Sequence, residues 1–210
     1  MLILERRVKD HAAVPGEANR PFGKVKRFRS RTDGGACHST LKGVHGPAVR
    51  FVRSYPHPID RVWQAVTTPE GLARWFPSEV ELDLRPGGVV TYRGDPYTED
   101  AQGRVLACEP PAYLALTWGG EELRFKLEPL AGGGCRFTLF DLLDGHDAAA
   151  RNAAGWDVCL RELDNHLDGK AADGPHGPAA TPWRPVYDAY VAAGLPSGAY
   201  IPIGPDSASS

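Results

Sequence analysis

The stretch EGLARWFPSEVELDLRPGGVVTYRG, residues 70–94, changes its periodicity from that of a helix to that of a strand. Leu72, Trp75 and Phe76 share one face of a short helix. After the proline that follows them, apolar and polar residues alternate, which is typical of a strand. A Pro-Gly-Gly turn then leads into VVTYR, a second alternating run. Because strands joined by so short a turn are antiparallel, the stretch places a helix at the start of an antiparallel sheet.

The preceding residues predict a first strand and a first helix. Residues 48–55, AVRFVRSY, alternate, and PHPID then ends the strand. In residues 59–67, IDRVWQAVT, the apolar side chains recur at the spacing of one helical face, with Trp63 among them. Thr68-Pro69 separates this helix from the short one described above. Two short helices therefore connect the first strand to the second.

The residues that follow predict an uninterrupted meander. Runs of strand character are separated by turns rich in Gly and Pro, too short for the crossover that a parallel pair needs. The six runs are SEVELDL, VVTYR, GRVLACE, AYLALTW, ELRFKLEPL and CRFTLFDLL, between residues 78 and 143. With the first strand they predict a seven-stranded antiparallel sheet, which curves because strands twist.

A long amphipathic helix is predicted over residues 147–167. Its apolar stripe includes Ala153, Trp156, Leu160 and Leu163, and Gly169 ends it. About 20 residues of helix span roughly 30 Å, enough to cross a domain. No other predicted element is long enough to cover the concave face of the sheet. The expected fold is therefore α+β, a curved sheet wrapped on a long C-terminal helix, with a cavity or large side chains between them.

The two ends of the chain differ in character from this domain, which we assign to residues 48–169. Residues 1–47 are basic and lack periodicity, so we predict a disordered arm. Residues 170–210 form a linker rich in Gly and Pro, with a short helix around Trp183 to Val191 and a frayed tail.

Charge and cysteine content restrict the function. Residues 1–50 hold eleven Lys and Arg against four Asp and Glu, whereas the remaining residues hold thirteen against twenty-two. Nucleic acid is therefore expected to bind only through the basic arm, if at all. The four cysteines are widely spaced, without a zinc motif, which favours a reducing cytoplasm. We expect neither a secretion signal nor a membrane span, because no apolar run is long enough.

Several ordered motifs resemble a known family. They are PHPIDRVWQAVTTPEGLARWFPSEVELDLRPGG, GRVLACEPPAYLALTWG, LRFKLEP and AAGWDVCLREL. Together they are similar to the Activator of Heat-shock-protein-90 ATPase homologue-like branch of the START-related superfamily, also called SRPBCC or birch-pollen-allergen-like. The resemblance covers about residues 49–167 and implies the helix-grip fold. It also implies a small-ligand-binding or stress-related role, since few bacterial members are known enzymes.

A ligand site follows from the fold and the aromatic residues. Trp75 and Phe76 are expected near the mouth of a cavity between the sheet and the long helix. The ligand is expected to be a hydrophobic or amphipathic small molecule, without a cofactor or metal, bound by a monomer or homodimer. The candidate residues from the helix faces and strand alternation are Trp63, Trp75, Phe76, Tyr92, Trp118, Phe125, Phe137, Trp156 and Leu160.

Two alternatives belong to other functional classes. One is a module that docks a chaperone or regulator, which needs an exposed apolar patch. The other is a cyclase-like or hydrolase-like enzyme, for which the best residues are Tyr92 or Tyr97 with Asp141 or His146. The resemblance argues against this, because Phe140 and Asp141 replace a polar pair of the family. Asp141 and its neighbours before the long helix are interpreted as helix caps, and no residue is assigned as catalytic.

Overall fold

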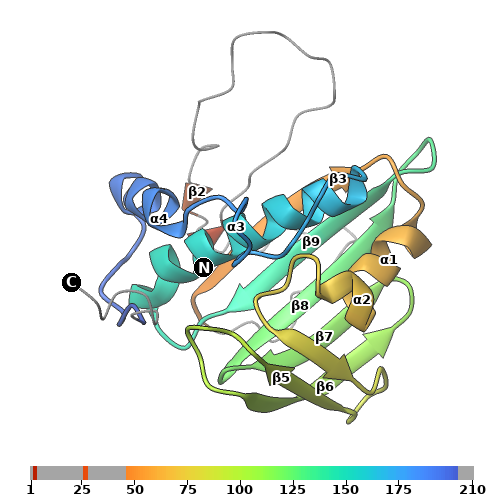
Figure 1. Cartoon of the computed structure of the whole chain (residues 1–210), viewed down its shortest axis with the longest axis horizontal. Coiled ribbons are helices and arrows are strands. Elements are labelled where there is room, and N and C mark those ends of the chain that lie inside the picture. The colour runs from red at the N-terminus through yellow and green to blue at the C-terminus, as the bar shows by residue number, and fades with distance from the viewer. Residues whose placement is uncertain (1, 4–25, 28–45, 203–210) are drawn as a thin grey trace, which may run out of the picture.

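The computed structural model describes residues 2–3, 26–27 and 46–202, and its main body has two layers (Figure 1). One layer is a seven-stranded antiparallel sheet with the strand order β3-β9-β8-β7-β6-β5-β4. The strands are β3 (Ala48–Tyr55), β4 (Glu79–Leu82), β5 (Val89–Arg93), β6 (Ala101–Glu109), β7 (Tyr113–Trp118), β8 (Glu121–Pro129) and β9 (Cys135–Leu142). Strands β4 to β9 form the expected meander, and the first strand, β3, pairs with the last, β9.

Helices form the second layer. The long helix α3 (Ala149–Leu167) lies along one face of the sheet, and α4 (Trp183–Ala192) lies beside it. Two short helices, α1 (Ile59–Thr67) and α2 (Pro69–Leu72), connect β3 to β4. A 3₁₀ turn, η1 (His146–Ala148), precedes α3. The predicted α+β helix-grip architecture, with seven strands, two short helices and a long helix, is confirmed.

The junction between α1 and α2 is held closely. The Thr68 hydroxyl accepts a hydrogen bond from the Gly71 amide at 3.1 Å, which caps α2. A side chain at Gly71 would place its Cβ 2.6 Å from the Gln64 carbonyl oxygen, so glycine is required for this approach. The indole Nε1 of Trp75 donates to the Ala65 carbonyl at 3.0 Å. Trp75 therefore fastens the α2 segment to α1 from inside the core.

The core fills the space between the sheet and α3. Phe51, Phe125, Phe137, Leu160 and Leu163 are all essentially inaccessible to solvent. Burying each large apolar side chain stabilises the fold by about 1.5–3 kcal/mol. The C-terminus of α3 is fixed as well, because His57 and Arg61 both bond to the Leu167 carbonyl oxygen, at 2.8 and 3.1 Å.

The element boundaries differ from the prediction at both helical regions. The second short helix was predicted over residues 70–76, but α2 ends at Leu72 and the following residues are turns. The long helix begins two residues later than predicted, after η1. The interpretation of the aspartates as caps is wrong, because neither η1 nor α3 has a side-chain cap.

The ends of the chain are described only in part. Within the predicted basic arm, β1 (Leu2–Ile3) pairs antiparallel with β2 (Lys26–Arg27). Residues 1, 4–25, 28–45 and 203–210 lie outside the described residues, so the predicted disorder and fraying remain predictions. The segment 170–202, predicted as a linker and helix, follows α3 and contains α4.

Candidate functional site

A cleft of about 940 Å³ lies at the N-terminal half of α3. The sheet contributes Tyr92, Trp118, Glu121 and part of the loop between β5 and β6. The opposite wall comes from the C-terminal segment, including Trp183 of α4, Ala199, Ile201 and Pro202. Three chain segments far apart in sequence therefore enclose one space.

Backbone and side-chain hydrogen bonds fix the C-terminal wall to α3. The Ala150 amide donates to the Pro196 carbonyl at 3.0 Å, and the Ala199 amide donates to the Asp147 carbonyl at 3.3 Å. The guanidinium of Arg151 donates to the Tyr200 carbonyl at 2.9 Å. These bonds hold the last described residues across the start of α3, where they complete the cleft.

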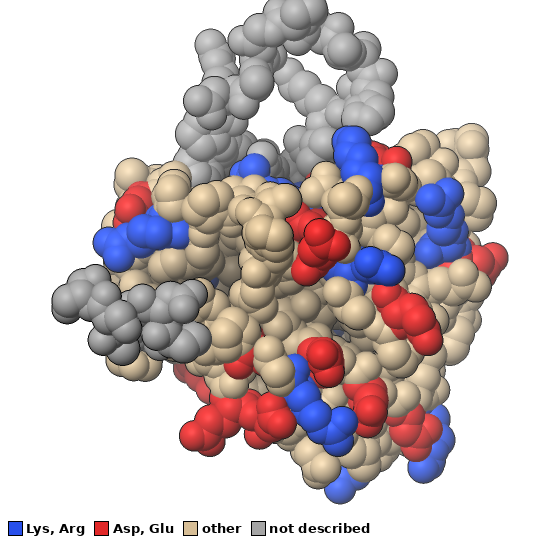
Figure 2. Space-filling view, in the orientation of Figure 1, with Lys and Arg blue, Asp and Glu red and all other residues tan. Residues whose placement is uncertain are grey.

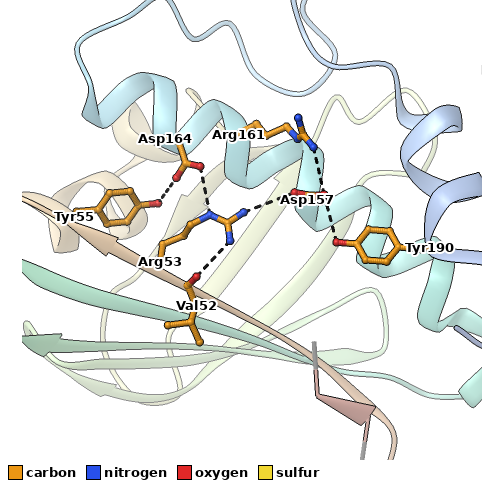
Figure 3. A network of polar contacts seen from close by, with 7 residues as sticks. All are labelled: Val52, Arg53, Tyr55, Asp157, Arg161, Asp164 and Tyr190. Carbon is orange, nitrogen blue, oxygen red and sulfur yellow. Dashed lines mark hydrogen bonds and ion pairs between the residues drawn. The ribbon is translucent and has the colours of Figure 1, made fainter. Parts of the chain in front are cut away.

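A buried polar network fixes α4 farther along α3 (Figure 3). The Tyr190 hydroxyl lies 3.3 Å from Asp157 Oδ2, which also pairs with Arg161 at 3.6 Å. Arg53 of β3 is only 2% exposed, and its guanidinium lies 3.7 Å from Asp157 and 3.3 Å from Asp164. Because a buried charge is costly unless paired, the network locks β3, α3 and α4 into one arrangement.

Three of the nine predicted ligand residues line the cleft: Tyr92, Trp118 and Trp156. The rings of Trp118 and Trp156 have centroids 5.3 Å apart. The Tyr92 hydroxyl donates to the Thr117 carbonyl at 2.8 Å, and burial raises the pKa of Tyr92 well above its usual value. This hydroxyl is thus already engaged within the protein, and Tyr92 presents mainly an aromatic surface.

The other six predicted ligand residues lie in the core and do not line this cleft. Trp75 packs against Phe76, Phe125 and Phe137, with ring centroids 5.7, 5.9 and 6.4 Å apart. Phe76 also contacts Trp118 and so supports the cleft wall from behind. A direct ligand contact stays a prediction for Trp63, Trp75, Phe76, Phe125, Phe137 and Leu160.

Two carboxyl groups form a polar cluster beside the aromatic wall. Glu121 lines the cleft and is 9% exposed, whereas Asp141 lies behind it and is fully buried. The amide Nδ2 of Asn152 donates to Glu121 Oε2 at 2.8 Å and to Asp141 Oδ2 at 3.0 Å. Trp156 Nε1 donates to the same Asp141 oxygen at 2.9 Å. Asp141 is therefore a hydrogen-bond acceptor for α3, which differs from the helix cap that the sequence suggested.

Burial changes the protonation of this pair. Loss of solvent and the nearby Asp141 charge raise the pKa of Glu121 to about 8. Burial also raises the pKa of Asp141, but the hydrogen bonds from Asn152 and Trp156 oppose that rise. Since donors surround Asp141, we assign the negative charge to Asp141 and the shared proton to Glu121 near neutral pH.

No pattern in the sequence indicates this pair of acids. Asp141 is directly opposite Leu123 in the pairing of β8 with β9, and Glu121 lies two residues before Leu123 on the same face of β8. Only the strand register, together with Asn152 of α3, brings the two acids together. The pairs named for an enzyme are not assembled in the cleft, because Tyr92 and Tyr97 line it while Asp141 and His146 do not.

The described residues contain neither a cluster of metal ligands nor a helix that could span a membrane. Over residues 46–202 and the two short strands, no three His, Cys, Asp or Glu residues are grouped to hold a metal ion. In the same residues, no helix has the length and apolar character to cross a membrane.

Comparison with solved structures supports the fold. A Bordetella parapertussis protein encoded by gene BPP1335 is 27% identical, with a TM-score of 0.57, over 81% of this chain and 94% of its own. CalU16 from Micromonospora echinospora is 25% identical, with a TM-score of 0.55, over 70% and 85%. DynU16, from the dynemicin biosynthetic locus, is 26% identical, with a TM-score of 0.53, over 60% of this chain and 50% of its own. No curated protein matches.

The family comparison agrees with the resemblance noted in the sequence. A family model described as Activator of Hsp90 ATPase homolog 1-like protein matches residues 56–168, more than half of the chain. The match includes the helix pair, the meander and α3, and it ends before the segment that forms the outer wall of the cleft. This protein therefore belongs to the Activator of Hsp90 ATPase homolog 1-like family.

Proposed function

We propose that this protein binds an amphipathic small molecule in the cleft between α3, the sheet and the C-terminal segment. The observation that carries the proposal is the cleft itself, whose volume of about 940 Å³ suits a small organic ligand. Family membership adds support, because this fold commonly binds ligands. DynU16, a structural neighbour, comes from a biosynthetic locus, which favours a secondary metabolite over a general stress role.

The two sides of the cleft suit the two parts of such a ligand. Trp118, Trp156 and Trp183 offer aromatic surface for an apolar body. Glu121 offers a hydrogen-bonding group for a polar end. The ligand-binding role proposed here requires no catalytic residue.

Gly155 provides a sharp test of this site. It lies on α3, lines the cleft, and an added Cβ would meet nothing within 4 Å. We therefore expect Gly155→Leu to fill part of the cleft without disturbing the core. Leucine is also the better helix former, so the free energy of unfolding should stay equal or rise by about 0.5–1 kcal/mol.

The experiment is a thermal-shift screen of the full chain against lipids, polyketides and aromatic amphiphiles. Compounds that raise the melting temperature of the unmodified protein should lose that effect in Gly155→Leu. Asn165→Leu is the matched control, since it adds the same side chain to α3 at a position that does not line the cleft. Ligands that stabilise both variants equally would place binding elsewhere and refute the proposal.

The location of the protein is part of the same proposal. The three cysteines in the described part of the chain, Cys108, Cys135 and Cys159, are all free thiols. Free thiols suit a reducing compartment, which supports a cytoplasmic role. Docking to a chaperone or regulator remains the alternative, and a partner captured equally by the unmodified protein and Gly155→Leu would favour it.

A further inference from the structure

We infer that the ligand of this cleft carries a cationic group, a protonated amine or its methylated form, which binds at Glu121 beside the buried Asp141. The inference rests on the proposed function and adds the chemical class of the ligand's polar end. It follows from the acceptors of the acid pair, the acidic residues that line the cleft and the aromatic rings beside them.

The acid pair has more acceptors than the protein satisfies. The hydrogen bonds from Asn152 and Trp156 to Asp141 both end on Oδ2. Asp141 Oδ1 is buried and accepts no hydrogen bond from a described nitrogen donor, so the further donor to the acid pair is the proton that Glu121 shares with Asp141. Asn152 Nδ2 already donates to both acids, so it has no further hydrogen to offer. A ligand with hydrogen-bond donors and a positive charge would compensate the negative charge of the acid pair. A carboxylate or phosphate on the ligand would be repelled by the same charge.

The other acidic residues of the cleft have the same electrostatic preference. Asp95, Glu99, Asp144 and Asp147 line it in addition to Glu121. Figure 2 shows acidic side chains gathered at the lower left of the face in view. A cleft lined by one sign of charge concentrates ions of the opposite sign.

The two basic groups that line the cleft already have partners. Arg151 donates to the Tyr200 carbonyl and to the side-chain oxygen of Asn152, at 2.9 and 3.0 Å. The His176 imidazole lies 3.7 Å from an Asp95 carboxylate oxygen. Neither group is therefore positioned primarily to receive an anionic ligand.

Aromatic side chains lie beside the acids in the wall of the cleft. Trp156 bonds to Asp141 through its indole nitrogen and packs against Trp118 with its ring. Indole faces attract alkylammonium groups, and this attraction increases when water is excluded. The same rings pack against the apolar part of a ligand, so one wall serves both ends of an amphipathic amine.

Proton exchange gives the inference a second, independent signature. Without ligand, the pKa of Glu121 is raised to about 8, and the groups that act on it are Asp141 of β9, Asp144 of the following loop and Arg151 of α3. A bound cation favours the Glu121 carboxylate and takes the place of its proton. Binding below pH 8 should therefore release a proton, and affinity should fall as the pH is lowered.

Three matched probes test the inference on the full chain: 2-(1-naphthyl)ethylamine, 2-(1-naphthyl)ethanol and the carboxylate 1-naphthaleneacetate. At pH 8 the amine should bind about tenfold more tightly than the alcohol, which corresponds to one charge-assisted contact, and the acetate should bind most weakly. Between pH 8 and pH 6 the amine affinity should fall about tenfold while the alcohol affinity stays constant. Calorimetry at pH 7 in two buffers of different ionisation enthalpy should show proton release with the amine alone.

Two variants complete the test. Glu121→Gln should remove most of the amine preference and its pH dependence, whereas Glu79→Gln, an exposed change on β4, should preserve both. An alcohol or acetate that binds as tightly as the amine, yet loses binding in Gly155→Leu, would overturn the inference while leaving the proposed function intact. Failure of the amine to bind at millimolar concentration would overturn it as well, as would an amine preference unchanged in Glu121→Gln.

Discussion

Asp141 owes its charge to two residues of α3. It is fully buried, yet the Trp156 and Asn152 donors reach one of its oxygens at 2.9 and 3.0 Å. A buried carboxylate without such donors would take up a proton. Trp156 therefore has two roles, since its indole nitrogen stabilises the acid while its ring forms the cleft wall. The sequence predicted Trp156 only as an aromatic ligand contact. In the structure Trp156 also stabilises the negative charge of Asp141 beside the cleft.

Glu121 should make the stability of the fold depend on pH. Its pKa of about 8 in the folded protein exceeds the value of about 4.3 in an unfolded chain. The folded state therefore holds a proton that the unfolded state loses. The resulting stabilisation is complete below pH 4.3 and is lost as pH rises through 8.

We expect Glu121→Gln to remove this dependence. Urea denaturation should show the free energy of unfolding of the unmodified protein falling between pH 5.5 and pH 8.5. Relative to the variant, the free energy of unfolding should fall by roughly 2 kcal/mol. This is less than the raised pKa of Glu121 alone would give, because Glu121 and Asp141 titrate together. Glu79→Gln should retain the fall. Parallel pH profiles for Glu121→Gln and the unmodified protein would show that Glu121 is ionised in the folded state.

At the scale of elements, β3 illustrates both the strength and the limit of sequence patterns. The alternation in AVRFVRSY predicted the strand Ala48–Tyr55 correctly, because one buried face leaves a strand little freedom in register. The same alternation puts Arg53 on the buried face with Phe51 and Tyr55, but it does not show which groups pair with a buried arginine. The partners of Arg53 are more than 100 residues away on α3, and no local pattern encodes such a contact.

The candidate site was predictable to a similar degree. Trp118 and Trp156 follow from strand and helix faces, and both line the cleft. The outer wall comes from residues 175–202, where Gly and Pro disrupt any periodicity and only α4 has a helical pattern. Contacts of such a segment depend on individual hydrogen bonds, such as that between Ala150 and Pro196. The sequence therefore predicted the scaffold and part of the aromatic wall, but not what closes the cleft.

Removing Arg53 should weaken the junction of β3, α3 and α4. Arg53→Met keeps the apolar stem but leaves Asp157 and Asp164 without its guanidinium. Breaking a buried ion pair in this way costs about 3–5 kcal/mol, and urea denaturation would measure the loss. Arg85→Met, which breaks the exposed pair with Asp83, should cost about 0–1 kcal/mol. Equal losses for the two variants would show that the buried network is not a major source of stability.

At the scale of the whole molecule, the cleft belongs to two parts of the chain. The match to the family model ends at residue 168. The segment that follows crosses the N-terminal half of α3 and is anchored by α4. Val186, Tyr190 and Leu195 of this segment are buried, so it is a packed wall. Its polar attachment to α3 includes the bond between the Tyr190 hydroxyl and Asp157, which Figure 3 shows pointing from α4 into the buried network. Ligand exchange should therefore depend on how firmly this segment is held.

Tyr190→Phe should loosen the wall while leaving the sheet intact. Phenylalanine keeps the buried ring and removes the hydroxyl, which costs about 0.5–1.5 kcal/mol for one hydrogen bond. Hydrogen exchange followed by mass spectrometry should show faster exchange over residues 183–202 and unchanged exchange in β8 and β9. A cleft-bound probe should dissociate several-fold faster from the variant. Tyr187→Phe is the control, because Tyr187 stacks on Trp183 with its ring centroid 4.8 Å away and its hydroxyl bonds to no described residue. If exchange rises equally in the sheet, the network supports the whole fold, and the C-terminal segment is not a separately opening wall of the cleft.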